Sequence, residues 1–211
     1  REATLLAFCI KKKKKFSLPL IKEKYVKRVV ELDANGYVKK EKVYAQIAKE
    51  YDLSSEIESA LFEDYMENFQ EFCVPFEGLI ETLTRLKQLR YKLGLITNGR
   101  HNGQHASIKA LSIESFFHVV LISESQEIAK PDVAIFERAL EMINVRANEA
   151  CYVRDHPIND IKKKKKIGLM TIWKKNELYA EANADEVIDT LPEIVPIVKG
   201  SSINELFTND A

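Results

Sequence analysis

Three short segments carry side chains suited to phosphate chemistry, and each follows an apolar run that reads as a strand. Thr97 and Asn98 end the first run, Lys130 and Pro131 lie a few residues after the second, and Asp155 ends the third. Hydroxyl and amide groups can donate hydrogen bonds to phosphate oxygens, a lysine places positive charge against them, and a carboxylate is an accepted Mg²⁺ ligand. Together these residue types predict a site for a phosphoryl group and its cation.

Segment 150–160 reads as a short buried strand ending at Asp155, a turn through Pro157, and a helix beginning near Asn159. A carboxylate at the carboxyl end of a parallel strand, facing a helix N-terminus, suits a cation and a phosphate. Taken alone, the segment is better explained as a surface helix capped by Asp155 and Asp160. The other two segments change that balance.

Strands that alternate with helices predict a parallel, doubly wound sheet in the second part of the chain. The expected strands are 92–97, 119–122, 150–154, 169–173 and 186–188, and the expected helices are 77–90, 103–111, 132–143, 158–167 and 192–198. Ligands of such sheets bind beyond the carboxyl ends of the strands. We therefore expect Thr97, Lys130 and Asp155 to meet along one rim and hold the same anion and its cation.

Residues 1–74 have a different pattern, with apolar side chains recurring at helical spacing. The expected helices are 1–16, 20–32, 40–51 and 55–73, although 5–10 taken alone could equally be a buried strand. The fold class predicted for the whole chain is α/β, a Rossmann-like sheet with an all-helical domain. The predicted domains are an all-helical domain at 1–74, a Rossmann-like core at 75–200 and a tail at 201–211.

The composition excludes several classes of protein. The chain has 32 Lys and Arg against 32 Asp and Glu, so it has no global field that attracts nucleic acid. No apolar run approaches the ~20 residues of a membrane helix. Cys9, Cys73 and Cys151 lie far apart, as expected for reduced thiols. We expect a cytoplasmic protein without nucleic-acid or membrane partners; the sequence carries no signal of its oligomeric state.

Other possible sites are weaker. His101 and His105 have the spacing of a zinc pair on a helix, but they lack the glutamate of a metalloprotease motif and Gly103 weakens the helix. Exposure or contact with substrate is therefore the favoured interpretation. The lysine runs 11–15 and 162–166 indicate solvated helix faces or, less often, an anionic partner. The chain has neither a P-loop nor a Gly-x-Ser-x-Gly motif, which disfavours the corresponding hydrolases.

The three segments resemble motifs of the haloacid dehalogenase-like hydrolase superfamily, and the resemblance covers nearly the whole chain. Residues 96–99, Ile-Thr-Asn-Gly, are similar to its second motif, and 130–132, Lys-Pro-Asp, to its third. Residues 153–160 resemble the fourth, written Gly-Asp-x-x-x-Asn-Asp in many members. The resemblance implies a Mg²⁺-dependent phosphatase that acts on a small phosphorylated metabolite through an aspartyl-phosphate. Residues 1–74 would then be the helical cap that such proteins insert after their first strand.

The same resemblance implies a role for each site residue. Thr97 and Asn98 would bind the phosphate, and Lys130 would bind it and steady the nucleophile. Asp155 would be the metal ligand and, with Lys130, part of the catalytic machinery. Asn159 and Asp160 would support the site from behind the metal ligand.

Two departures from the family pattern qualify these expectations. The first motif, Asp-x-Asp-x-(Thr/Val), which supplies the nucleophile, is absent, so we expect it upstream of Arg1, on a strand at the centre of the sheet. Arg154 stands where the family usually has glycine, and it could crowd the site or point away as a surface cation. The alternatives are a non-catalytic phosphate- or partner-binding relative, an inactive fragment, or a 2-haloacid dehalogenase, which Asp155 makes less favoured.

Overall fold

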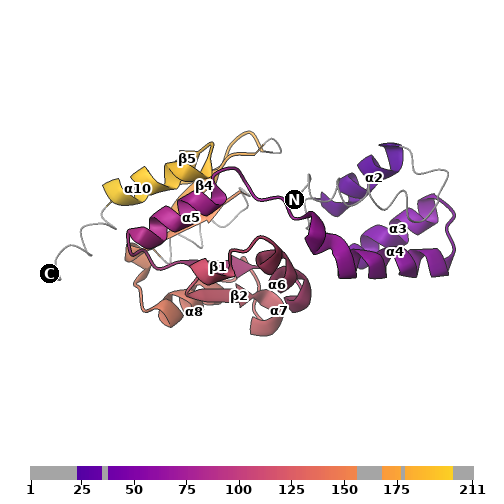
Figure 1. Ribbon diagram of the computed structural model, residues 1–211, viewed down its shortest axis with the longest axis horizontal. Helices are drawn as coiled ribbons and strands as arrows, with labels where there is room; N and C mark the ends of the chain where they lie inside the picture. Colours follow the sequence, from indigo (N-terminus) through magenta and orange to yellow (C-terminus); the bar gives the residue numbers. More distant parts are fainter. Residues whose placement is uncertain (1–22, 35–37, 156–167, 177–178, 202–211) are drawn as a thin grey trace. The chain divides into compact units, whose positions relative to one another are not determined.

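The computed structural model describes residues 23–34, 38–155, 168–176 and 179–201. The chain divides into two compact units, one made of Arg1–Val74 with His105–Leu111 and the other of Pro75–Gln104 with Ser112–Ala211 (Figure 1). In the described ranges, no helix combines the length and the apolar character needed to cross a membrane. Several predicted features lie outside the described residues: Asn159, Asp160, both lysine runs, and the helices expected at 1–16 and 158–167.

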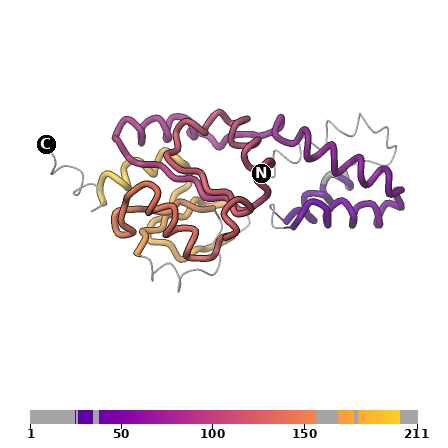
Figure 2. Tube along the Cα trace, turned by 90° about the horizontal axis from the view of Figure 1, so that it is seen from below, coloured from indigo at the N-terminus to yellow at the C-terminus, as the bar shows by residue number. Residues whose placement is uncertain are grey.

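Between residues 23 and 74, the described part of the first unit contains three helices, formed by the predicted amphipathic segments. They are α2 (Glu23–Asp33), α3 (Lys40–Glu50) and α4 (Ser55–Asn68), and the 3-10 turn η2 (Phe69–Phe72) follows α4. Figure 2 shows them as adjacent coils in the indigo and purple part of the chain. Their apolar faces bury one core, made of Tyr25, Val29, Val43, Tyr44, Ile47, Leu61 and Tyr65. The helices therefore form because each has one face that only its neighbours can shield from water.

The described residues of the second unit contain five strands, all paired in parallel. β1 (Gly94–Thr97) pairs with β2 (Val119–Ile122), and β3 (Cys151–Arg154) pairs with β4 (Met170–Lys174), which also pairs with β5 (Glu186–Ile188). The unbroken apolar sequence of β2 is typical of a strand covered on both faces, and three of its four residues are buried. Parallel strands alternating with helices confirm the predicted α/β class.

The other described helices come before, between and after the strands. They are α5 (Leu79–Gln88), α6 (His101–Ala110), α7 (Ser123–Gln126), α8 (Val133–Ile143) and α10 (Ile194–Gly200), with 3-10 turns η3 (Glu114–Phe116), η4 (Ala147–Glu149) and η5 (Leu191–Glu193). All belong to the second unit except the part of α6 from His105 onward, which belongs to the first. Asp132 caps α8, because its Oδ1 accepts a hydrogen bond from the Ala134 N–H at 3.0 Å. One core joins α8 to β1 and β2, and a second joins α5 and α10 to β3, β4 and β5.

The described strands form two sheets, whereas the sequence predicts one. The first has the order β1-β2 and the second the order β3-β4-β5. Within the described part of the chain, β1 and β3 therefore each pair along one side only. The other edge of each of these two strands has no hydrogen-bonded neighbour among the described strands, so the two sheets are not continuous.

Candidate active site

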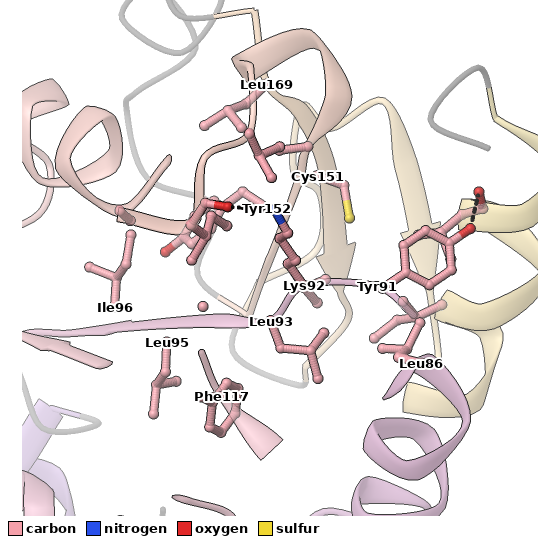
Figure 3. A pocket seen from close by; sticks show the side chains of 18 of the residues that line it. Leu86, Tyr91, Lys92, Leu93, Leu95, Ile96, Phe117, Cys151, Tyr152 and Leu169 are labelled. Carbon is pink, nitrogen blue, oxygen red and sulfur yellow. Dashed lines mark hydrogen bonds between the residues drawn. The ribbon is translucent and has the colours of Figure 1, made fainter. Parts of the chain in front are cut away.

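An apolar cavity of about 410 Å³ lies between the two sheets. We call it the interstrand slot. Residues of β1 and β3, the two strands that each have one unpaired edge in the described part of the chain, line it. Helices α5 and α8 contribute further apolar side chains. Figure 3 shows Leu93, Leu95 and Ile96 of the β1 segment on one side and Cys151 and Tyr152 of β3 on another. The slot thus combines unpaired backbone edges with an apolar lining, the two features that a buried strand requires.

Lys130 reaches from the loop before α8 to residues of both strands that line the slot. Its Nζ donates a hydrogen bond to the Ile96 carbonyl oxygen at 2.8 Å and lies 3.5 Å from the Tyr152 hydroxyl. Burial lowers the pKa of Lys130, and the negative charge of Asp155 acts in the opposite direction. Among the residues that the structure describes, no carboxylate forms an ion pair with this ammonium. It is a largely buried cation placed where an anion could bind.

Asn98 directs its side chain to the backbone of Lys130. Its Nδ2 donates to the Lys130 carbonyl oxygen at 2.8 Å, and its Oδ1 accepts from the Lys130 N–H at 2.8 Å. The sequence predicts that this amide donates to phosphate. In the structure the side chain joins the end of β1 to the loop that carries the lysine.

Thr97 is the last residue of β1, and its side chain is half-buried. Its hydroxyl donates to Oε1 of Gln104 at 2.7 Å. The next turn is tied to the end of β2, because the Gly99 N–H donates to the Ser123 hydroxyl at 2.9 Å and the His101 N–H donates to the Glu124 carboxylate at 2.7 Å. Sequence reasoning did not assign a role to Ser123 or Glu124, although their place directly after a strand was a usable signal.

Asp155 follows the last residue of β3, and its side chain is exposed. Its backbone carbonyl accepts a hydrogen bond from Nε1 of Trp173 at 3.1 Å, which fixes the chain at the end of β3. No hydrogen bond to its carboxylate occurs within the described segments. They also contain no group of three His, Cys, Asp or Glu side chains able to hold a metal. Mg²⁺ commonly binds through one or two carboxylates, phosphate oxygens and water, so Asp155 fits as one protein ligand.

Arg154 and Cys151 both lie on β3, and both are at least partly buried. Arg154 is only 8% exposed, and its Nη2 donates to the Asn183 carbonyl oxygen at 3.0 Å. It is therefore a buried side chain directed toward the loop before β5, and neither interpretation from the sequence describes it. Burial raises the pKa of the Cys151 thiol to about 11, so this cysteine is a protonated packing residue of the second core at neutral pH.

The histidine pair does not form a shared site in the part of the chain that is described. Nδ1 of His101 lies 2.7 Å from the Ser125 hydroxyl, so this ring is engaged with the turn after β2. No zinc-like cluster occurs around either His101 or His105 in those segments. The favoured candidate site is therefore the one at the ends of β1 and β3.

We predict that replacing Lys130 with methionine changes the dependence of stability on pH. The folded state has a lower Lys130 pKa than the ordinary value of 10.5. At pH values below both the folded-state and the unfolded-state pKa of Lys130, the buried ammonium destabilises the fold. Between these two pKa values the unfolded chain binds more protons than the folded one, so the free energy of unfolding of the wild type rises with pH. Lys130→Met removes this rise. Urea unfolding at a series of pH values up to 10.5 measures it.

The matched control is Lys199→Met, at an exposed lysine near the end of α10. This variant is expected to keep the wild-type pH dependence. A Lys130→Met protein whose stability follows pH in parallel with the wild type would contradict the burial argument.

Comparison with known proteins supplies the family. Residues 2–174 match the model of the haloacid dehalogenase-like hydrolases. The glyceraldehyde 3-phosphate phosphatase of Pyrococcus furiosus is 37% identical over 128 residues, covering 58% of this chain and 53% of the relative. The chain thus spans about half the length of this curated relative.

Solved structures show the same fold. The HAD-hydrolase YfnB of Bacillus subtilis, bound to magnesium, superposes with a TM-score of 0.73 at 20% identity, covering 92% of this chain and 91% of the other. A HAD phosphatase of Thermococcus onnurineus has a TM-score of 0.63 at 24% identity, with 93% and 89% covered. Because the family model matches most of the chain, the protein belongs to the haloacid dehalogenase-like hydrolase family.

Proposed function

We propose that this protein is a Mg²⁺-dependent phosphatase that acts on small phosphorylated metabolites through an aspartyl-phosphate. The observation that carries the proposal is the position of Lys130. Its largely buried ammonium contacts Ile96 of β1 and Tyr152 of β3, within electrostatic range of Asp155. A cation held in this way stabilises the negative charge of a phosphoryl group during its transfer.

The interstrand slot supports a position for the nucleophile. A strand seated between β1 and β3 would pair with both edges and bury its side chains in the apolar lining. An aspartate at the carboxyl end of that strand would emerge beside Lys130. We therefore propose that the nucleophile belongs to a strand supplied from outside the described residues.

The chemistry follows from these positions. A carboxylate oxygen of the nucleophile attacks phosphorus, the bond from phosphorus to the leaving-group oxygen breaks, and an acid on the same strand protonates the departing alcohol. Water then attacks phosphorus and gives a proton to the same group, which now acts as a base, while the bond from phosphorus to the aspartate oxygen breaks and phosphate is released. Lys130 holds the phosphate oxygens, the hydroxyl of Thr97 donates to them after turning from Gln104, and Asp155 would hold Mg²⁺. When bound, this ion offsets the negative charge of the reacting groups.

We propose a substrate class from the name of a relative. A relative is named as a glyceraldehyde 3-phosphate phosphatase, so a triose phosphate is a rational first metabolite to test. The helical first unit would select among substrates as a cap, and Asn159 and Asp160 would support the metal ligand.

The test is to extend the chain at its N-terminus with an apolar strand ending in Asp-x-Asp and to assay hydrolysis of an aryl phosphate. We expect Mg²⁺-dependent turnover that EDTA removes. The control carries the same strand with Asn-x-Asn. If the extended chain folds but shows no turnover with Mg²⁺, the protein is a phosphate- or partner-binding member of the family, and the proposed activity is wrong.

A further inference from the structure

We infer that Asn98 is a positioning residue, which sets the location of the Lys130 side chain by clamping its backbone, and that it does not itself bind the phosphate. The clamp is reciprocal: the amide group of Asn98 donates to the Lys130 carbonyl and accepts from the Lys130 N–H, both at 2.8 Å. The phosphate role of Lys130 is part of the proposed function, but the clamp can be tested without it.

The chemistry of the pair requires an amide side chain. A single planar group must offer one donor and one acceptor to the two backbone groups of the same residue, which asparagine and glutamine alone can do. Glutamine is one methylene longer, so it would displace the loop. Aspartate would place an acceptor against the Lys130 carbonyl. The residue type at position 98 is therefore explained by the backbone it holds.

The end of β1 holds Lys130 at both ends. Asn98 fixes the backbone of the lysine, while the carbonyl of Ile96, two residues earlier, accepts from its Nζ at 2.8 Å. A lysine side chain is long and flexible, and its tip is placed accurately only when its base is also fixed. Because these bonds connect residues separated by 32 and 34 positions, the loop before α8 needs such an anchor.

The alternative is that Asn98 contacts phosphate through its remaining N–H. The two possibilities differ in what happens to Lys130 when no phosphate is present. If Asn98 clamps the lysine, removing its amide frees the ammonium from the strand end. If Asn98 serves only the phosphate, the lysine stays where it is.

The first experiment measures the rate at which Lys130 is acetylated by an amine reagent, using mass spectrometry on the full chain. Asn98→Leu, similar in size and without polar atoms, is expected to raise the rate at Lys130 by at least about threefold, the scale of one ordinary hydrogen bond. Asn148→Leu, at an exposed asparagine of η4, is the matched control and should leave the rate unchanged. An unchanged rate in the Asn98 variant overturns the inference. Asn98→Ala replaces Asn98→Leu if the latter does not fold.

The second experiment is a double-mutant cycle with inorganic phosphate as the probe. If Asn98 acts through Lys130, Asn98→Ala should weaken phosphate binding in the wild-type background. In a Lys130→Ala background it should cause no further loss of phosphate affinity. An equal loss in both backgrounds would mean that Asn98 binds phosphate directly, which overturns the inference. Absence of phosphate binding by the wild type would count against the proposed function, and the acetylation rates would still decide the clamp.

Discussion

Replacing Asp155 with asparagine is expected to lower kcat/KM for aryl phosphate hydrolysis by about 100-fold or more. The measurement uses the chain extended at its N-terminus with the Asp-x-Asp strand. The exposed carboxylate follows β3 and fits as a protein ligand of Mg²⁺. A bound metal contributes several kcal/mol of charge stabilisation in the transition state, and about 3 kcal/mol corresponds to about a 100-fold change in rate. Asparagine preserves the size of the side chain and removes its charge. Steady-state kinetics over a range of Mg²⁺ concentrations measures both the rate and the metal requirement.

Asp189→Asn provides the matched control. Asp189 is an exposed carboxylate after β5 that forms an ion pair with Lys175. Losing a surface ion pair changes stability by only about 0–1 kcal/mol, so turnover should stay near the wild-type value. If Asp155→Asn keeps full Mg²⁺-dependent activity, Asp155 is not the metal ligand.

Replacing Ile172 with alanine is expected to destabilise the second unit by about 2–5 kcal/mol. The side chain is 0% exposed at the middle of β4, within the core shared by α5, β5 and α10. Its partner across the ladder is Val153 of β3, which lines the interstrand slot. The substitution leaves a cavity beside β3, the strand that Asp155 follows. Urea unfolding followed by Trp173, the single tryptophan of the chain, reports on this unit.

Val187→Ala on the neighbouring strand β5 is the matched control. It shows whether the loss of stability comes from the burial of Ile172 or from shortening any side chain on a strand. Val187 is 43% exposed. Its truncation should change the free energy of unfolding by about 0.5 kcal/mol or less, as for most surface substitutions. Equal losses for the two variants would show that the packing around Ile172 is not what stabilises the sheet.

Local patterns located most of the helices and strands. The strand predicted at 119–122 is β2 at Val119–Ile122, and the short strand at 186–188 is β5. The helix predicted at 132–143 is α8 with Asp132 as its cap. These segments were predictable because the spacing of apolar residues within a short stretch indicates a buried strand or the buried face of a helix. The helical turn α7 was not expected, since four polar residues after β2 carry no periodic signal.

The sequence by itself determined which chemical groups end or follow the strands: the Thr97 hydroxyl, the Lys130 ammonium and the Asp155 carboxylate. It could not determine that Lys130 would join β1 to β3, or that Asn98 would hold its backbone. Those bonds connect residues separated by 22 to 34 positions, and only folding brings them within 3.5 Å. Hydrogen bonds over such separations depend on the packing of whole strands and helices, whereas the pattern of a strand depends only on its own residues.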